Sequence, residues 1–314
     1  MNTQSNAVPE SPLDPQAIAP AAMSATRPMY WSLRREFWEN RSIYIAPLAA
    51  AAVYLFGFLI SLFWVPRSMR GMAAHGPMPP VIVLAMPYSH AAMLLTLTAF
   101  LVGIFYSLDA LHGERRDRSI LFWKSLPVSD LTTVLSKASI PLVVLPLLAF
   151  AITVTLQLIM LLLNTAVLLM SHASTATLWA PPLFEMELVL LYALIVLALW
   201  HAPIYCWFLL VSGWARRATF LWAVLPPLAI AVFEKIAFRT SYLESMLHDR
   251  LFGFTAAAFD LKDKNGVPID AHFIPLTQLA ARRFLSSPGL WLGLIVAAAC
   301  LVAAVRLRRY QRPI

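Results

Sequence analysis

The chain is built from long runs of apolar residues separated by short polar stretches. Six of these runs are long enough to cross about 30 Å of hydrocarbon as helices that rise 1.5 Å per residue. They are residues 43–65, 82–108, 140–170, 188–212, 218–238 and 288–305. The pattern therefore predicts an all-α polytopic membrane protein with six transmembrane helices.

The second and third runs are longer than a membrane requires, and they contain Pro87, Pro141 and Pro146. Proline removes a helical hydrogen bond and clashes with the preceding turn, and an overlong apolar helix adjusts by tilting or kinking. We expect these two spans to tilt, to kink or to begin outside the hydrocarbon.

The composition agrees with a lipid environment. Hydrophobic residues make up 60% of the chain and charged residues 13%, whereas about a quarter of a soluble domain is charged. The two cysteines, Cys206 and Cys300, each lie inside an apolar run, so the sequence predicts no disulfide framework and no thiolate metal site.

The positive charge indicates orientation. Lys and Arg in short loops are retained in the cytoplasm, and 15 of the 24 basic residues fall on one side if both termini are cytoplasmic. Most of the others lie in the long loop 239–287, where the rule is weakest. We therefore expect both termini in the cytoplasm, and the net charge of +8 predicts membrane orientation rather than nucleic-acid binding.

The chain before the first span divides into two segments. Residues 1–28 are rich in Pro, Ala and Ser and are expected to form a disordered cytoplasmic tail. Residues 29–42 predict an amphipathic helix in the membrane interface; the alternative is a Trp-anchored leader into the first span. Arg34 and Arg41 fall inside the apolar arc and would have to extend to lipid phosphates. That arc consists of Tyr30, Trp31, Leu33, Phe37 and Trp38.

Residues 43–314 are expected to form the transmembrane domain, with a cytoplasmic loop at 109–138 and an outer loop with short helices at 239–287. The cytoplasmic loop mixes charge pairs with an apolar patch, and Ser129 or Asp130 is placed to cap a new helix. A solvated positive loop would explain its arginines. It would not explain the interleaved aromatic and aliphatic residues, which suit lipid headgroups or a protein partner.

The cytoplasmic loop resembles that of permease subunits of the ABC-2 transporter type. The resemblance lies in Gly113-Glu114-Arg115, Ser119-Ile120-Leu121, Ser125-Leu126-Pro127-Val128-Ser129 and Ser136-Lys137. It implies a bacterial plasma (inner) membrane exporter subunit that couples to a separate ATP-binding cassette ATPase and pairs with a second copy or a related permease. The residues that it places at the ATPase contact are Glu114, Arg115, Arg118, Ser119, Leu126, Pro127, Val128, Ser129 and Lys137.

Motifs for catalysis are absent from the sequence. Gly71 and Gly76 alone have the spacing of a phosphate-binding loop, and Pro77 follows the second glycine where that loop needs Lys. The seven histidines show no pair at metal-ligand spacing. We therefore expect a non-enzymatic subunit with no metal and no cofactor of its own, and with ATP and magnesium on the partner ATPase.

Three polar residues lie inside the predicted spans. Gln157 and Asn164 are seven residues apart on the third span, hence on nearly the same face, and His201 lies near the middle of the fourth. They are candidates for a translocation path. Hydrogen bonding between helices is the alternative for each of them.

Two other classes of function are compatible with six spans. A membrane enzyme or scaffold for lipid-linked chemistry would be expected to gather acids, histidines or a nucleophile at one interface. A secondary transporter driven by an ion gradient usually shows internal repeats and ionisable residues at mid-membrane. The scattered acids and histidines of this sequence argue against the first class, and no internal repeat or mid-membrane carboxylate is evident to favour the second.

Overall fold

The computed structural model describes residues 26–62, 80–117, 128–170, 183–260 and 274–310. Within these ranges the regular structure is helical, apart from an isolated antiparallel bridge between Phe259 and Leu279. Six of the described helices are long and apolar enough to cross a membrane. The predicted all-α polytopic architecture is therefore confirmed.

Five spans begin and end within a few residues of the predicted runs. The six spans contain α2 (Ser42–Leu62), α4 (Pro80–Asp109), α8 (Leu145–Met170), α9 (Leu183–Trp214), α10 (Thr219–Phe238) and α14 (Pro288–Tyr310). The third span differs, because its helix starts well before the apolar run.

The third span begins with α7 (Asp130–Ser139), passes through a π-helical turn at Ile140–Val144 and continues as α8. Ser129 caps α7 as predicted, since its hydroxyl accepts a hydrogen bond of 3.1 Å from the backbone N–H of Thr132. Pro141 lies in the π-helical turn, a local departure from α-helical pairing that accommodates its missing N–H. The proline thus distorts the helix without ending it.

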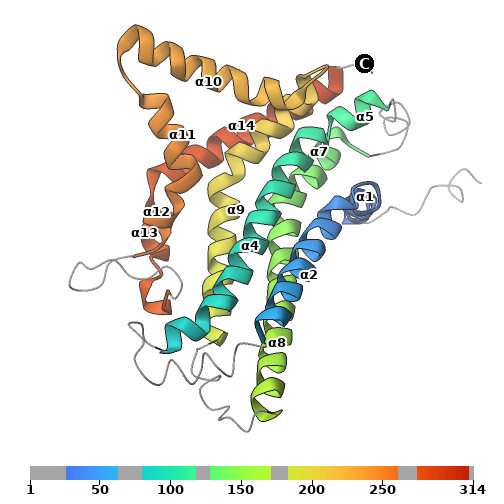
Figure 1. Cartoon of the computed structure of the whole chain (residues 1–314). Helices are drawn as coiled ribbons and strands as arrows, with labels where there is room; N and C mark the ends of the chain where they lie inside the picture. The colour runs from blue at the N-terminus through green and yellow to red at the C-terminus, as the bar shows by residue number, and fades with distance from the viewer. Residues whose placement is uncertain (1–25, 63–79, 118–127, 171–182, 261–273, 311–314) are drawn as a thin grey trace, which may run out of the picture.

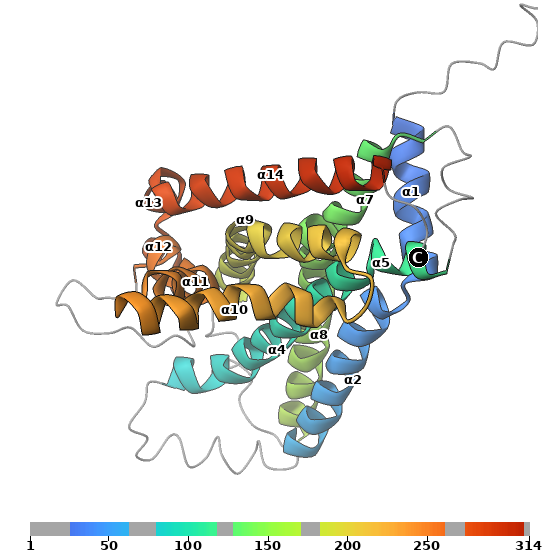
Figure 2. The same cartoon turned by 90° about the horizontal axis from the view of Figure 1, so that it is seen from above.

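The spans α2, α4, α8 and α9 lie side by side, and α14 packs along α9 (Figures 1 and 2). At one end of this bundle the helices α1 (Thr26–Glu39), α5 (His112–Arg116) and α7 meet the C-terminal end of α14 (Figure 1). We call this the charged end. Buried apolar side chains fill the bundle beneath it, among them Ile43, Tyr106, Leu111, Val134 and Leu209.

Short helices connect α10 to α14. They are α11 (Tyr242–Phe252), α12 (Phe254–Ala258), a 3-10 turn at Leu276–Gln278 and α13 (Ala281–Ser286). Trp200 of α9, Ala258 and Phe284 belong to one buried cluster. This segment therefore packs on the bundle.

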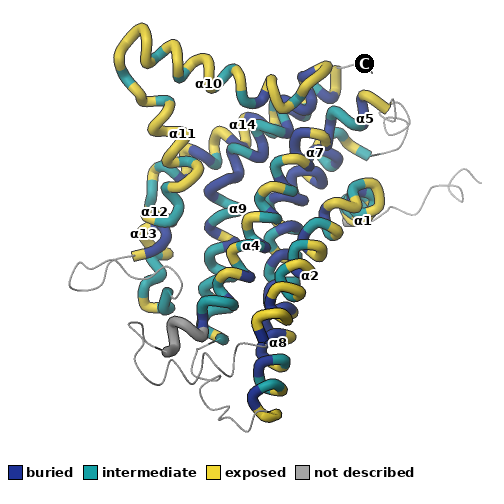
Figure 3. Tube along the Cα trace, viewed as in Figure 1, coloured by how far each residue is buried: buried dark blue, intermediate teal, exposed yellow. Residues whose placement is uncertain are grey.

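The helix α10 is the least packed of the spans. Only Ala223 is buried on it, and the indole N–H of Trp207 donates a 3.0 Å hydrogen bond to the carbonyl oxygen of Ala223. Beyond that point α10 runs away from the other spans, and most of its residues are exposed (Figures 1 and 3). A helix that is apolar on all sides needs lipid or another chain around it.

Gly103 of α4 allows the close approach of α9 and the π-helical turn. A Cβ atom at this position would lie 2.9 Å from the ring of Tyr205 and 3.3 Å from Pro141, whereas a Cβ at Gly57 of α2 would meet nothing within 4 Å. Gly103→Leu should therefore destabilise the protein by about 1–3 kcal/mol through overpacking. The measurement is the thermal unfolding midpoint of the purified protein in detergent, with Gly57→Leu as the matched control. Equal midpoints for the two variants would show that α4 and α9 are not closely packed there.

Candidate functional site: a buried ion-pair cluster

Six charged side chains from four helices meet at the charged end. Arg35 and Glu36 come from α1, Glu114 from α5, and Arg308 from the last turns of α14. The helix α7 contributes two side chains seven residues apart, hence on nearly the same face. The ion-pair cluster consists of Arg35, Glu36, Glu114, Asp130, Lys137 and Arg308.

Glu114 joins three other helices. Its Oε1 lies 2.6 Å from Nη2 of Arg35 and 3.2 Å from Nζ of Lys137, and its Oε2 accepts a hydrogen bond from Nη1 of Arg308. The Nε of Arg308 also donates to Oδ1 of Asp130 at 3.1 Å. One carboxylate on a five-residue helix thereby links α5 to α1, α7 and α14.

Glu36 is the second centre of the cluster and is 0% exposed. Its Oε1 accepts hydrogen bonds of 2.9 Å from both Nζ of Lys137 and Nη2 of Arg35. Its Oε2 accepts from the hydroxyl of Tyr106 at 2.7 Å and from the amide of Asn40 at 3.2 Å. Both of its oxygens are therefore satisfied within the chain.

The cluster contains three carboxylates and three cations, so it is formally neutral. Buried charges persist only when opposite charges and hydrogen bonds compensate their loss of water. Burial by itself would raise the pKa of Glu36, but the charges of Lys137 and Arg35 outweigh it and hold that pKa below its ordinary value. Glu36 is therefore ionised at neutral pH.

The short helix α5 is fixed to the end of α9 by reciprocal hydrogen bonds. The hydroxyl of Ser212 accepts from the backbone N–H groups of Leu111 and His112, each at 2.9 Å. In return, Nη1 of Arg115 donates to the carbonyl oxygens of Gly213 at 2.6 Å and Ala215 at 3.2 Å. These bonds satisfy terminal backbone groups of both helices, so α5 and α9 hold each other in place.

The outer face of α1 is aromatic. Trp31 and Trp38 are 57% and 70% exposed, and the guanidinium of Arg34 lies 5.2 Å and 5.0 Å from their ring centroids. On the inner side, Leu33 and Phe37 pack against the bundle. Stacking on the two indoles therefore explains how the charged side chain of Arg34 is accommodated in the aromatic face.

The residues expected at an ATPase contact fall into three groups. Glu114, Arg115 and Lys137 are buried and paired within this chain. Val128 is half-buried and Ser129 is exposed, just before α7. The remaining four, Arg118, Ser119, Leu126 and Pro127, lie outside the described residues, as does most of the predicted N-terminal tail.

Two of the candidate path residues lie together. Nε2 of Gln157 donates to the backbone oxygen of Tyr88 at 3.1 Å, and Nδ2 of Asn164 donates to the hydroxyl of the same tyrosine at 3.4 Å. Both α8 side chains are buried, and within the described part of the chain their carbonyl oxygens have no hydrogen-bond partner. They therefore join α8 to α4.

His201 lies in a different environment, against the segment that follows α10. Its ring nitrogens are 3.0 Å and 3.3 Å from the backbone oxygens of Leu197 and Leu251. Beside it, Arg250 of α11 donates to the backbone oxygens of Trp200 at 3.2 Å and Gly289 at 2.7 Å, with its guanidinium 4.8 Å from the Trp200 ring centroid. His201 and Arg250 thus attach α11 to α9 and α14.

Glu36, Arg35, Asp130 and Arg308 were not among the site residues expected from the sequence. Arg35 and Glu36 lie outside the apolar arc expected for residues 29–42. One signal was present, because Asp130 and Lys137 stand at i, i+7 on a short helix, on nearly the same face as the apolar residue Val134. A charge on such a face needs a partner from another element.

No group of three His, Cys, Asp or Glu side chains that could hold a metal ion occurs in the ranges given above. In the ion-pair cluster each charge already has an opposite charge beside it, so the cluster is suited to holding helices together. Comparison of the chain with protein-family models, curated proteins and solved structures finds no match.

Replacement of Glu114 should be strongly destabilising. Glu114→Gln leaves buried Lys137 and Arg308 without one of their counter-charges, and breaking a buried pair in this way costs about 3–5 kcal/mol. The free energy of unfolding in mixed micelles measures the loss. The matched control is Glu39→Gln, because the side chain of Glu39 is 42% exposed and pairs with Arg35 at 3.4 Å; its effect should stay within about 0.5 kcal/mol. Similar losses in both variants would refute a central role for Glu114.

The cluster should also make stability depend on acid pH. The folded pKa of Glu36 is lowered from an ordinary value of 4.5, so its stabilising contribution is complete above that value and disappears as pH falls through the folded pKa. The unfolding midpoint should therefore fall in acid more steeply for the unmodified protein than for Glu36→Gln. The difference between the two proteins should be largest at neutral pH. A difference that stays constant into strong acid would contradict the ionised, paired state of Glu36.

Proposed function

We propose that the protein is the permease subunit of an ATP-driven transporter, an exporter of the ABC-2 type, with the charged end in the cytoplasm. A separate ATPase subunit would bind there and supply ATP and magnesium, and the spans would form the translocation path. The distribution of basic residues and the likeness of the loop motif to that family support this reading.

The observation that carries the proposal is how the loop segment is attached to the spans. Its first end, α5, is fixed to α9 through Ser212 and Arg115, and its second end, α7, continues through the π-helical turn into α8. Glu114 connects both ends with α1 and α14. A force applied to the segment between α5 and α7 would therefore reach several spans at once.

We assign different roles to the residues of the loop motif. Glu114, Arg115 and Lys137 hold the loop to the bundle from the inside, since they are buried. The contact with the ATPase falls to Arg118, Ser119, Leu126, Pro127, Val128 and Ser129. Exposed Arg116 and Asp117 at the end of α5 border this contact. In this arrangement one set of residues touches the partner and the other transmits its movement.

Pairing of two permease subunits follows from the same proposal. The exposed apolar surface of α10 includes Leu225, Ile230 and Phe233, which are 52%, 59% and 64% exposed. A second copy or a related permease is one way to cover such a surface. The path would then lie between subunits, and Gln157, Asn164 and His201 stay candidates for its polar lining.

Docking of the ATPase is tested by co-purification. The protein is co-expressed with an ATP-binding cassette ATPase subunit from the same genome. Leu126→Glu combined with Pro127→Glu should lower the co-purified ATPase by about tenfold or more, because charges replace apolar contacts at an interface. ATP-dependent transport should fall in parallel, while the unfolding midpoint should not change.

The matched control is Leu285→Glu on α13, which places a charge on a leucine that is 54% exposed and lies in the segment between α10 and α14. It should leave ATPase recovery unchanged. Unchanged recovery and transport in the Leu126 and Pro127 variant would overturn the docking assignment.

A further inference from the structure

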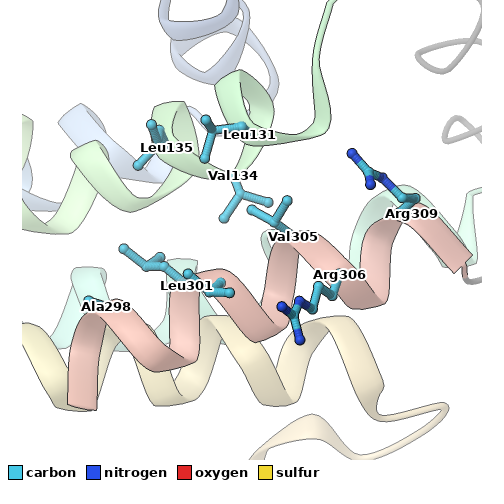
Figure 4. A pocket seen from close by; sticks show the side chains of 9 residues that line it. Leu131, Val134, Leu135, Ala298, Leu301, Val305, Arg306 and Arg309 are labelled. Atoms are coloured by element: carbon cyan, nitrogen blue, oxygen red, sulfur yellow. The ribbon is translucent and has the colours of Figure 1, made fainter. Parts of the chain in front are cut away.

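A groove of about 370 Å³ lies between α7 and α14 at the charged end. One wall consists of Leu131, Val134 and Leu135 of α7, and the other of apolar side chains of α14, with Leu301 and Val305 facing α7 (Figure 4). Leu131 is 54% exposed, so the groove opens toward the surroundings. It is apolar along its length.

The apolar wall covers much of the depth of one lipid leaflet. On α14 it reaches from Ala298 to Val305, which is about 10 Å at the helical rise of 1.5 Å per residue. Half of a hydrocarbon layer is about 15 Å. A single acyl chain entering from the leaflet therefore has an apolar wall beside it from the interface toward the membrane centre.

Two arginines stand where the apolar wall ends. Arg306 and Arg309 lie one turn apart on α14, line the groove and are exposed (Figure 4). Among the described side chains neither forms an ion pair, whereas Arg308 between them is buried and paired with Glu114 and Asp130. Their guanidinium groups point to different sides of α14 in Figure 4. From neighbouring turns both long side chains can reach a phosphate at the end of the apolar channel, and guanidinium groups suit phosphate oxygens.

We propose that this groove binds an anionic phospholipid of the leaflet at the charged end. One acyl chain lies between α7 and α14, and the phosphate accepts hydrogen bonds from Arg306 and Arg309. Basic pockets between membrane helices are suited to anionic headgroups. The inference depends on the membrane architecture and is independent of the proposed transport function.

The lipid site adjoins the ion-pair cluster. Leu131 follows Asp130 directly, and Asp130 pairs with Arg308. Arg308, between Arg306 and Arg309, pairs with both Glu114 and Asp130, so a lipid bound to its two neighbours contacts α14 at the turn that is joined to α5 and α7. The bound lipid thus stabilises the contact between α7 and α14.

The site is tested on the full-length protein by native mass spectrometry, with dioleoyl phosphatidylglycerol and dioleoyl phosphatidylcholine as probes. The unmodified protein should retain the anionic lipid at least about tenfold better. Arg306→Gln combined with Arg309→Gln should abolish the preference. The control, Arg216→Gln combined with Arg217→Gln, removes the same charge from two exposed arginines between α9 and α10 and should preserve it.

Two further arms separate a lipid from a free phosphate. Val302→Trp fills the groove and should lower phosphatidylglycerol retention although both arginines remain. Glycerol 3-phosphate, which has the headgroup without acyl chains, should not displace the bound lipid.

Equal retention of the two lipids, full retention in the double arginine variant or displacement by glycerol 3-phosphate would each overturn the proposal. Crosslinking of the unmodified protein with a photoactivatable phosphatidylglycerol tests the site without any substitution. The adducts should map to α7 or α14. Adducts confined to other helices would refute the site even if a variant failed to fold.

Discussion

A charge that is removed from water must meet an opposite charge, and this requirement organises the charged end. Glu114 and Glu36 are buried acids, and the cations that compensate them come from α1, α7 and α14. Because each carboxylate is shared among several helices, displacement of one helix leaves charges on the others uncompensated. The contacts of these two carboxylates therefore fix the positions of α1, α5, α7 and α14 relative to one another.

The remainder of the molecule is held by close packing of helices and by hydrogen bonds to backbone oxygens. Gly103 lets the ring of Tyr205 approach α4 closely, and Arg250 attaches α11 to two spans through backbone oxygens. At Gly293 a Cβ atom would collide with the guanidinium of Arg250, which would then have to shift from its hydrogen bonds to Trp200 and Gly289. In contrast, α10 makes few contacts, and its apolar surface is left for lipid or another subunit.

The loop between α4 and α7 contains both buried and exposed charged residues, and its sequence does not show which are which. Glu114 and Lys137 have the same charged character as Arg116 and Asp117, but the first two are buried in the cluster and the last two are 60% and 64% exposed. The buried pair explains how the loop is held, and the exposed pair lies where a partner could reach it. The groove beside α14 adds lipid as a third participant at this end.

The sequence by itself determined the six spans, the approximate ends of five of them and a cap at Ser129 or Asp130, because these depend on runs of neighbouring residues and on local hydrogen bonding. It did not determine which charges are buried. Arg35 and Glu114 are 79 residues apart in the chain and Glu114 and Arg308 are 194 apart, so no local pattern links them. Only the tertiary structure decided that Glu36 and Lys137 face the interior, since a buried charge is stable only where folding brings its partners from distant helices.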